Sequence, residues 1–67
     1  MKILLNNRKE TIEPDNITVS ELLKLKNFTW KMLVIKINGK VIKRHEYDLL
    51  KINEGDDVAV IHLITGG

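Results

Sequence analysis

The Asn38-Gly39 dipeptide constrains the fold of this chain most, because it separates two runs rich in β-branched residues. Asparagine and glycine both tolerate the positive φ values that a two-residue hairpin turn requires. The flanking runs, Leu33–Ile37 and Lys40–Ile42, are therefore expected to pair as antiparallel strands. Alternation places the odd-numbered residues of the first run toward the core and the even-numbered ones outward.

Another hairpin is expected at the start of the chain, where Asn6-Asn7 interrupts an apolar run that begins at Lys2. The returning strand, residues 8–13, is more polar, with Glu10 and Ile12 on its core side. Pro14 ends this strand, because proline has no N–H to donate to a sheet.

A single helix is expected over residues 19–26. Thr18 and Glu21 have the spacing of a capping box, in which each side chain accepts a backbone N–H of the other residue. Apolar groups recur at helical spacing and form a stripe that would face the sheet. This stripe contains Val19, Leu22, Leu23 and the stem of Lys26, and Leu25 is expected to widen it. Asn27 suits a left-handed stop.

The second half of the chain predicts a polar crossover over residues 43–52, a turn at Glu54-Gly55-Asp56-Asp57 and a last strand over residues 58–63. In that strand, Val58 and Val60 would face the helix.

The remaining side of the last strand carries the aliphatic row Ala59, Ile61 and Leu63. An exposed row of this kind suggests a partner surface. The alternative is that both rows are covered within the monomer, but one helix covers only one face of a sheet.

The elements together predict an α+β fold in which one helix covers one face of a mixed four- to five-stranded sheet. A chain of 67 residues has room for one small domain, here residues 1–63, followed by a flexible tail at residues 64–67. No apolar run approaches the ~18 residues that span a bilayer, so a cytoplasmic protein without a membrane partner is expected. The free protein is expected to be a monomer.

Composition excludes several kinds of chemistry. The chain has no cysteine, and hence no disulfide, cysteine-based zinc site, thiol nucleophile or persulfide carrier. His45 and His62 lack partners at metal-ligand spacing, so no metal or catalytic role is expected for them. Asp56-Asp57 suits a turn better than a divalent-ion site. The expectation is a protein without catalytic residues of its own.

A cluster of basic residues on the second hairpin raises the question of RNA binding. With one Tyr, one Trp and one Phe, the chain has no stacking platform to accompany these cations, so a solvated or partner-facing patch is expected and nucleic acid is not. The cluster comprises Lys36, Lys40, Lys43 and Arg44. Phe28 and Trp30 are expected to pack over the helix end.

The terminal Gly66-Gly67 would place a free carboxylate on an unbranched stalk. Terminal glycines also arise as expression remnants, trimmed linkers or frayed ends. Here they follow a predicted strand closely, which favours a functional tail.

Four segments in order resemble the ThiS/MoaD group of ubiquitin-like β-grasp proteins, and within it the ThiS branch. They are MKILLN (residues 1–6), VIKINGKVIKR (34–44), EGDDV (54–58) and the terminal GG. The resemblance covers essentially the whole chain. It departs from the ThiS pattern at Lys43, where proline often precedes the arginine. The MoaD branch is usually longer and often has proline before its glycines, whereas the only proline here is Pro14.

This resemblance implies a sulfur carrier for thiazole formation in thiamin biosynthesis. A ThiF-like enzyme would use ATP to adenylate the Gly67 carboxylate, a sulfur-donating enzyme would convert it to a thiocarboxylate, and a ThiG-like thiazole synthase would receive the sulfur. No bound cofactor is implied. Ala59, Ile61, Leu63, Ile64 and Thr65 would contact the partners, with Gly66 and Gly67 entering the active site.

Physical chemistry is compatible with that cycle. A terminal carboxyl of pKa about 3.3 to 3.7 is ionised at neutral pH and needs no general base. Residues 64–67 reach at most about 13 Å when extended. Other sulfur acceptors (molybdopterin, a tRNA base or a cysteine precursor), a ubiquitin-like protein modifier and a plain interaction module remain alternatives.

Overall fold

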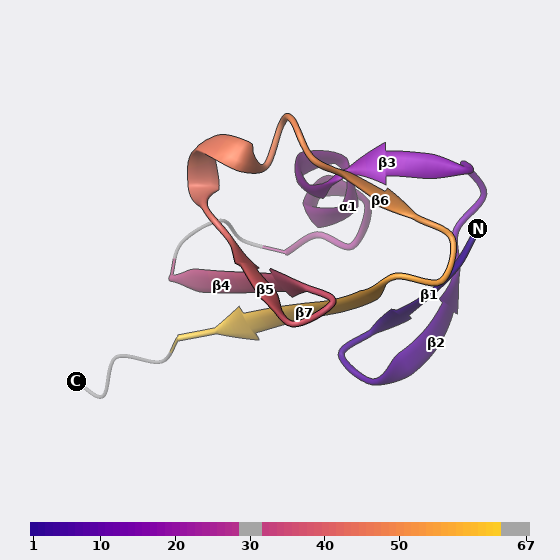
Figure 1. Cartoon of the computed structure of the whole chain (residues 1–67), viewed down its shortest axis with the longest axis horizontal. Helices are drawn as coiled ribbons and strands as arrows, with labels where there is room; N and C mark the ends of the chain where they lie inside the picture. The colour runs from indigo at the N-terminus through magenta and orange to yellow at the C-terminus, as the bar shows by residue number, and fades with distance from the viewer. Residues whose placement is uncertain (29–31, 64–67) are drawn as a thin grey trace.

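The computed structural model describes residues 1–28 and 32–63 (Figure 1). Its elements, in chain order, are β1 (Lys2–Leu5), β2 (Arg8–Thr11), β3 (Asn16–Thr18), α1 (Val19–Leu25), β4 (Leu33–Ile37), β5 (Lys40–Ile42), the 3-10 helix η1 (Arg44–Glu46), β6 (Lys51–Asn53) and β7 (Asp57–His62). Five strands form one mixed sheet in the order β2-β1-β7-β4-β5, while β3 and β6 form a separate two-stranded sheet. Only the β1–β7 pairing is parallel in these sheets. The predicted α+β architecture is confirmed.

Both predicted hairpins are present and close with two-residue turns. Asn38 and Gly39 have φ values of 52° and 83°, and Asn6 and Asn7 have φ values of 52° and 65°. These positive values match the right-handed twist of the strands that they join. The turns therefore set the pairing of Ile37 with Lys40 and of Leu5 with Arg8.

The capping box at the start of α1 is also confirmed. The Glu21 backbone N–H donates to Thr18 Oγ1 at 3.1 Å, and the Thr18 backbone N–H donates to Glu21 Oε1 at 2.9 Å. At the other end, Asn27 has a φ of 58°, the left-handed conformation expected of a helix stop. The sequence therefore fixes both ends of the helix.

The hydrophobic core lies between α1 and one face of the large sheet. Val19, Leu22 and Leu23 of the helix are fully buried in one cluster with residues from the strands, among them Ile3, Leu5, Ile35, Val58 and Val60. Glu10 and Lys26 close one side of this interface with an ion pair of 2.8 Å between Oε1 and Nζ. The core-side positions predicted for Glu10 and for the stem of Lys26 are consistent with this pairing.

The predicted core position of Leu25 is wrong, because 57% of this residue is exposed. At about 100° per residue, Leu25 lies roughly 110° from the centre of the stripe formed by Val19, Leu22 and Leu23. This angle directs it past the edge of the sheet. The helix therefore presents one large aliphatic side chain to solvent.

The crossover predicted over residues 43–52 contains more structure than a polar connection. It includes η1 and β6, and β6 pairs with β3 so that Ile52 lies opposite Ile17. Three-residue strands are too short to produce a visible alternation in the sequence. Tyr47 anchors the segment in the core, and its carbonyl oxygen accepts the Ser20 backbone N–H at 3.0 Å.

The turn before β7 is joined to the β4–β5 turn by side-chain hydrogen bonds. Asn38 Oδ1 accepts the Asp57 backbone N–H at 2.9 Å, and Asn38 Nδ2 donates to Asp56 Oδ1 at 3.1 Å. The other Asp56 carboxylate oxygen accepts the Asn53 backbone N–H at 2.8 Å. Asp56 therefore has a structural role in this turn. Within residues 1–28 and 32–63, no helix has the length and apolar character needed to cross a membrane.

The capping box predicts a pH-dependent contribution to stability. The backbone N–H and hydroxyl of Thr18 hold the pKa of the Glu21 carboxyl below its ordinary value. A lowered pKa in the folded state means that this stabilisation is present above the unfolded pKa and is lost as pH falls through the folded one. We expect Glu21→Gln to remove this acid-dependent loss, measured by urea unfolding between pH 7 and pH 3.

A companion variant tests the other half of the capping box. Thr18→Ala should lower the free energy of unfolding by about 1 kcal/mol at neutral pH, since a helix N-terminal donor loses its partner. An unchanged unfolding midpoint for this variant would contradict the role of the cap.

Candidate functional site

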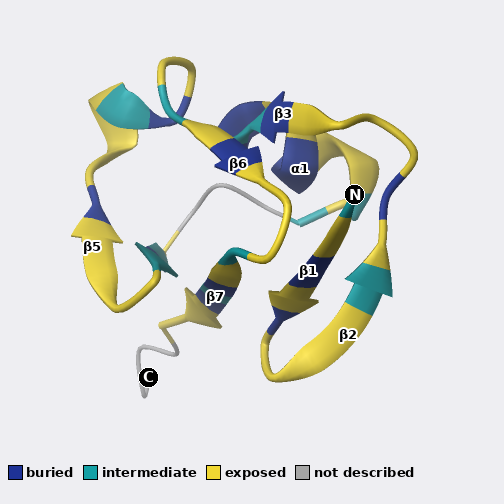
Figure 2. Cartoon of the chain, turned by 45° about the vertical axis from the view of Figure 1, so that its right-hand side comes forward, coloured by how far each residue is buried: buried dark blue, intermediate teal, exposed yellow. Residues whose placement is uncertain are grey.

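The two sides of β7 differ sharply in burial, as Figure 2 shows. Val58 is fully buried and Val60 is 4% exposed, whereas Ile61 is 43% exposed and Leu63 is 48% exposed. Ala59 is half-buried on the same side as Ile61. The predicted alternation of the last strand is therefore confirmed, although Leu63 lies one residue beyond the observed strand.

Neighbouring strands extend this aliphatic row into a patch. In the antiparallel register, Val34 lies opposite Ile61, and Lys36 lies between Ala59 and Val41. Val41 is 55% exposed. We call Val34, Val41, Ala59, Ile61 and Leu63 the outer patch. The sequence analysis missed Val34 and Val41 as site residues, although their outward parity was visible in the alternation of the second hairpin.

The end of β7 is held firmly where the outer patch meets the start of β4. The Leu63 backbone N–H donates to the Met32 carbonyl oxygen at 2.6 Å. One residue earlier, the His62 ring packs edge-on against Phe28, with centroids 5.6 Å apart. Phe28 in turn packs against the core. His62 therefore has a packing role at this position.

The remaining predicted site residues lie outside the described part of the chain. These are Ile64, Thr65, Gly66 and Gly67, and the predicted packing of Trp30 lies outside it as well. Among the residues that the structure does describe, no three His, Asp or Glu side chains form a group that could hold a metal ion. The candidate site is therefore the outer patch, from which the chain continues past Leu63.

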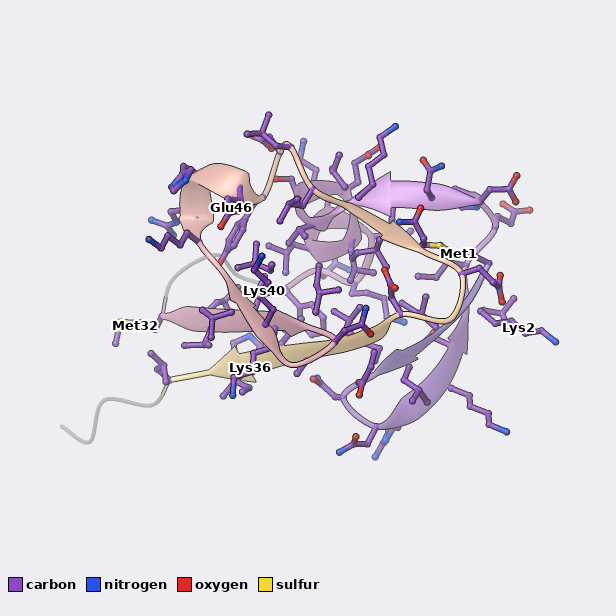
Figure 3. The ribbon with its side chains drawn as sticks, in the orientation of Figure 1. Met1, Lys2, Met32, Lys36, Lys40 and Glu46 are labelled. Atoms are coloured by element: carbon purple, nitrogen blue, oxygen red, sulfur yellow. The ribbon has the colours of Figure 1, made fainter. Side chains whose placement is uncertain are left out.

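Basic residues lie on the hairpin that carries part of this patch. Lys36 shares its face, whereas alternation places Lys40 on the other face, with Ile42. Lys36 belongs to β4 and Lys40 begins β5, as Figure 3 shows, and Lys43 and Arg44 follow β5 at the start of η1. The Lys43 backbone N–H donates to Glu46 Oε1 at 3.0 Å. Cationic groups beside exposed aliphatic residues suit a partner surface that carries carboxylates.

The arrangement of the strands and the helix defines the structural class of the protein. A mixed five-stranded sheet with one helix on one face, and with β1 and β7 parallel at its centre, is the β-grasp arrangement of ubiquitin-like proteins. A family model described as "ThiS family" matches residues 2–67. The chain belongs to the ThiS family.

Two solved structures resemble the chain over its whole length. The crystal structure of the thiamine biosynthesis protein ThiS from Geobacter metallireducens shares 28% identity at a TM-score of 0.88, with each chain covered completely. The solution NMR structure of a thiamine biosynthesis protein from Geobacter metallireducens shares 25% identity at a TM-score of 0.82, with 100% of this chain and 88% of that chain covered. No curated protein gives a significant match. Membership in the ThiS family identifies a small carrier protein and supports a role as a sulfur carrier in thiamine biosynthesis.

The burial pattern of β7 predicts opposite results for its two sides. Val60→Ala should lower the free energy of unfolding by about 1 to 3 kcal/mol, because it leaves a cavity in the core. Leu63→Asp should change it by no more than about 0.5 kcal/mol, because the side chain is already half in solvent. Denaturant melts of both variants measure the difference. Unfolding by Leu63→Asp together with a harmless Val60→Ala would show that the assignment of faces is wrong.

Proposed function

We propose that this protein carries sulfur for thiazole formation in thiamine biosynthesis, as a thiocarboxylate on its terminal glycine. The observation that carries the proposal is the family match, which extends through Gly66 and Gly67. The outer patch lies at the start of that tail and offers an apolar surface to a partner enzyme. The protein acts in this scheme as a co-substrate.

The proposed chemistry has two steps. A carboxylate oxygen of Gly67 attacks the α-phosphate of ATP on a ThiF-like enzyme, and pyrophosphate leaves. The resulting acyl-adenylate is then attacked by a hydrosulfide ion that a sulfur-donating enzyme supplies, so that a C–S bond forms and AMP leaves with its electron pair. The thiocarboxylic acid then loses its proton to give the thiocarboxylate. Because the chain has no cysteine, the terminal carboxyl carbon is the place where this protein can hold the sulfur.

Glycine at the last two positions suits this reaction. A tail without side chains can pass through a narrow channel and adopt backbone angles that other residues avoid. Residues 64–67 reach at most about 13 Å, so the enzyme must bind the folded domain close to its active site. The outer patch is the surface that we propose for this contact, with Ile61 and Leu63 as its anchors beside the tail.

Changes to the tail should separate activation from folding. We expect deletion of Gly67, or Gly66→Val, to abolish ATP-dependent adenylation by the partner enzyme. Neither change should move the unfolding midpoint, because both lie beyond the core elements. Adenylation is followed by pyrophosphate release, and unfolding by circular dichroism. Normal adenylation of the shortened chain would refute the carrier proposal.

Changes to the outer patch should weaken binding while leaving the reactive end intact. Ile61→Asp places a charge that must be desolvated at the partner contact, so its affinity for the adenylating enzyme should fall by about tenfold or more. Leu49→Asp is the matched control, since Leu49 is 73% exposed and lies in the crossover between η1 and β6. Equal effects of the two variants would place the partner contact elsewhere.

The fate of the sulfur can be tested on protein isolated from its own cells. A thiocarboxylate adds about 16 Da to the intact mass, because sulfur replaces one oxygen. Gly-Gly remnants on lysines of other proteins would instead support a protein modifier. An unchanged mass under conditions of thiamine synthesis would count against the carrier and favour an interaction module with an incidental tail.

A further inference from the structure

The two edges of the large sheet differ in what they offer to another strand. The edges are β2 and β5, since the strand order is β2-β1-β7-β4-β5. In an antiparallel pair, alternate residues turn their N–H and C=O groups toward the partner strand or away from it. The register of each hairpin therefore decides which backbone groups remain for an incoming strand.

In β2, the residues whose backbone N–H and C=O groups point away from β1 are Lys9 and Thr11. The two-residue turn makes Leu5 and Arg8 a hydrogen-bonded pair, and the alternation continues to Met1 and Ile12. The Ile12 N–H donates to the Met1 carbonyl oxygen at 2.8 Å, which confirms that Met1 and Ile12 are a hydrogen-bonded pair in this alternation. Two N–H groups and two C=O groups therefore point away from the sheet along β2.

The edge at β5 offers less. By the same alternation, Lys40 and Ile42 turn their backbone groups toward β4, so Val41 alone faces outward within the strand. The next residue, Lys43, donates its N–H to Glu46 Oε1 and accepts the Glu46 N–H at its carbonyl oxygen at 2.8 Å. Strand addition of more than one residue is therefore favoured at β2.

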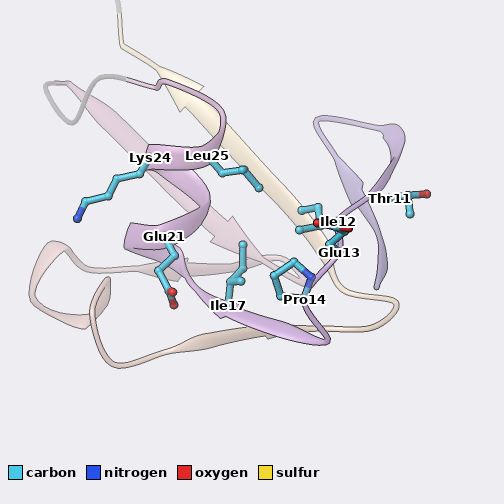
Figure 4. Close-up of a pocket in the computed structure, with 8 residues that line it drawn as sticks. All are labelled: Thr11, Ile12, Glu13, Pro14, Ile17, Glu21, Lys24 and Leu25. Atoms are coloured by element: carbon cyan, nitrogen blue, oxygen red, sulfur yellow. The ribbon is translucent and has the colours of Figure 1, made fainter.

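A groove between the helix and the chain from the end of β2 to Pro14 lies on the inner side of this edge (Figure 4). Its apolar wall consists of Ile12, Pro14, Ile17 and Leu25, and Figure 4 shows Leu25 directed toward Ile12, away from Lys24. Leu25 is the exposed helix residue that the core does not use. Glu13, Glu21 and Lys24 also line the groove, so its charged groups are negative in sum and this side favours aliphatic side chains over acidic ones.

A second hollow lies on the outer side of the same edge and has the opposite charge preference. Lys2, Leu4, Lys9 and Thr11 line it together with Glu54. Glu54 Oε1 already accepts the Lys2 backbone N–H at 2.9 Å, and Glu10, also beside the hollow, is paired with Lys26. In the part of the chain that the structure describes, neither lysine ammonium forms an ion pair. This side favours acidic side chains.

We propose that the β2 edge binds an extended segment of a partner protein by strand addition. Successive side chains of a strand point to opposite sides, so the segment would alternate aliphatic residues, toward the inner groove, with acidic residues, toward Lys2 and Lys9. A second copy of this chain fits poorly, because its β2 strand, Arg8–Thr11, has no aliphatic side chain to place in the inner groove.

This edge is separate from the outer patch. Thr11 pairs with Lys2 at the start of β1, before the part of β1 that pairs with β7. Leu63 follows the last residue of β7, at the other end of that strand. Figure 1 shows β2 at the right of the molecule and the arrowhead of β7 toward the left. A partner bound at β2 would therefore leave the tail accessible to an enzyme.

The test uses an acetylated and amidated heptapeptide in which valine alternates with aspartate, titrated into the full chain labelled with nitrogen-15. We expect amide shifts at Lys9, Thr11 and Leu25. Leu25→Asp and Lys9→Glu should each weaken binding by about tenfold, and a peptide with lysine in place of aspartate should bind at least about tenfold more weakly. No shifts at millimolar peptide, or shifts centred on Val41 and Ile61, would overturn the proposal.

Proline variants test whether the peptide binds through backbone hydrogen bonds, as strand addition requires, or only through contacts with side chains. Thr11→Pro removes an outward N–H that β1 does not use, and Val41→Pro is the matched change at the other edge. Thr11→Pro should abolish peptide binding and Val41→Pro should leave it unchanged, each in a variant with a folded amide spectrum. Equal binding by both would overturn the proposal, as would sedimentation showing a dimer that Thr11→Pro dissociates. Adenylation plays no part in this assay, so its outcome is independent of the proposed function.

Discussion

One helix on one face of a five-stranded sheet is the constraint on which the rest of this structure depends. Val19, Leu22 and Leu23 bury the inner face, and no second layer is available within the described residues to cover the outer one. The strands therefore alternate between core residues and residues that meet solvent. The difference between the two sides is clear in β7, which lies at the centre of the sheet and is followed by the predicted tail.

The central position of β7 depends on contacts at both of its ends. Its first residues pair with β1 in parallel, and the Asp57 N–H donates to Asn38 Oδ1. At the other end, the Leu63 N–H donates to the Met32 carbonyl oxygen. These contacts extend to Leu63, the last residue before the predicted tail.

The same sheet also has a second kind of surface at its edge. The outer patch is a face, where side chains would carry the proposed affinity, whereas the β2 edge has outward backbone groups that an extended segment could use. The inner groove and the lysines of the outer hollow would add specificity through side-chain parity. Two surfaces at opposite sides of a 67-residue protein allow it to be held by one partner and processed by another.

Local signals in the sequence determined the hairpins, the helix and the two faces of β7. Asn38-Gly39, Asn6-Asn7 and the Thr18–Glu21 box act within a few residues, and alternation separates Val60 from Ile61 without reference to the rest of the fold. The outer row of the candidate site could therefore be predicted. The exposure of Leu25 also follows from its angle on the helix. Tertiary structure alone decided the β3–β6 sheet and the assembly of Val34 and Val41 with Ile61. Both depend on which distant segments pair, and local periodicity does not encode pairing between distant strands.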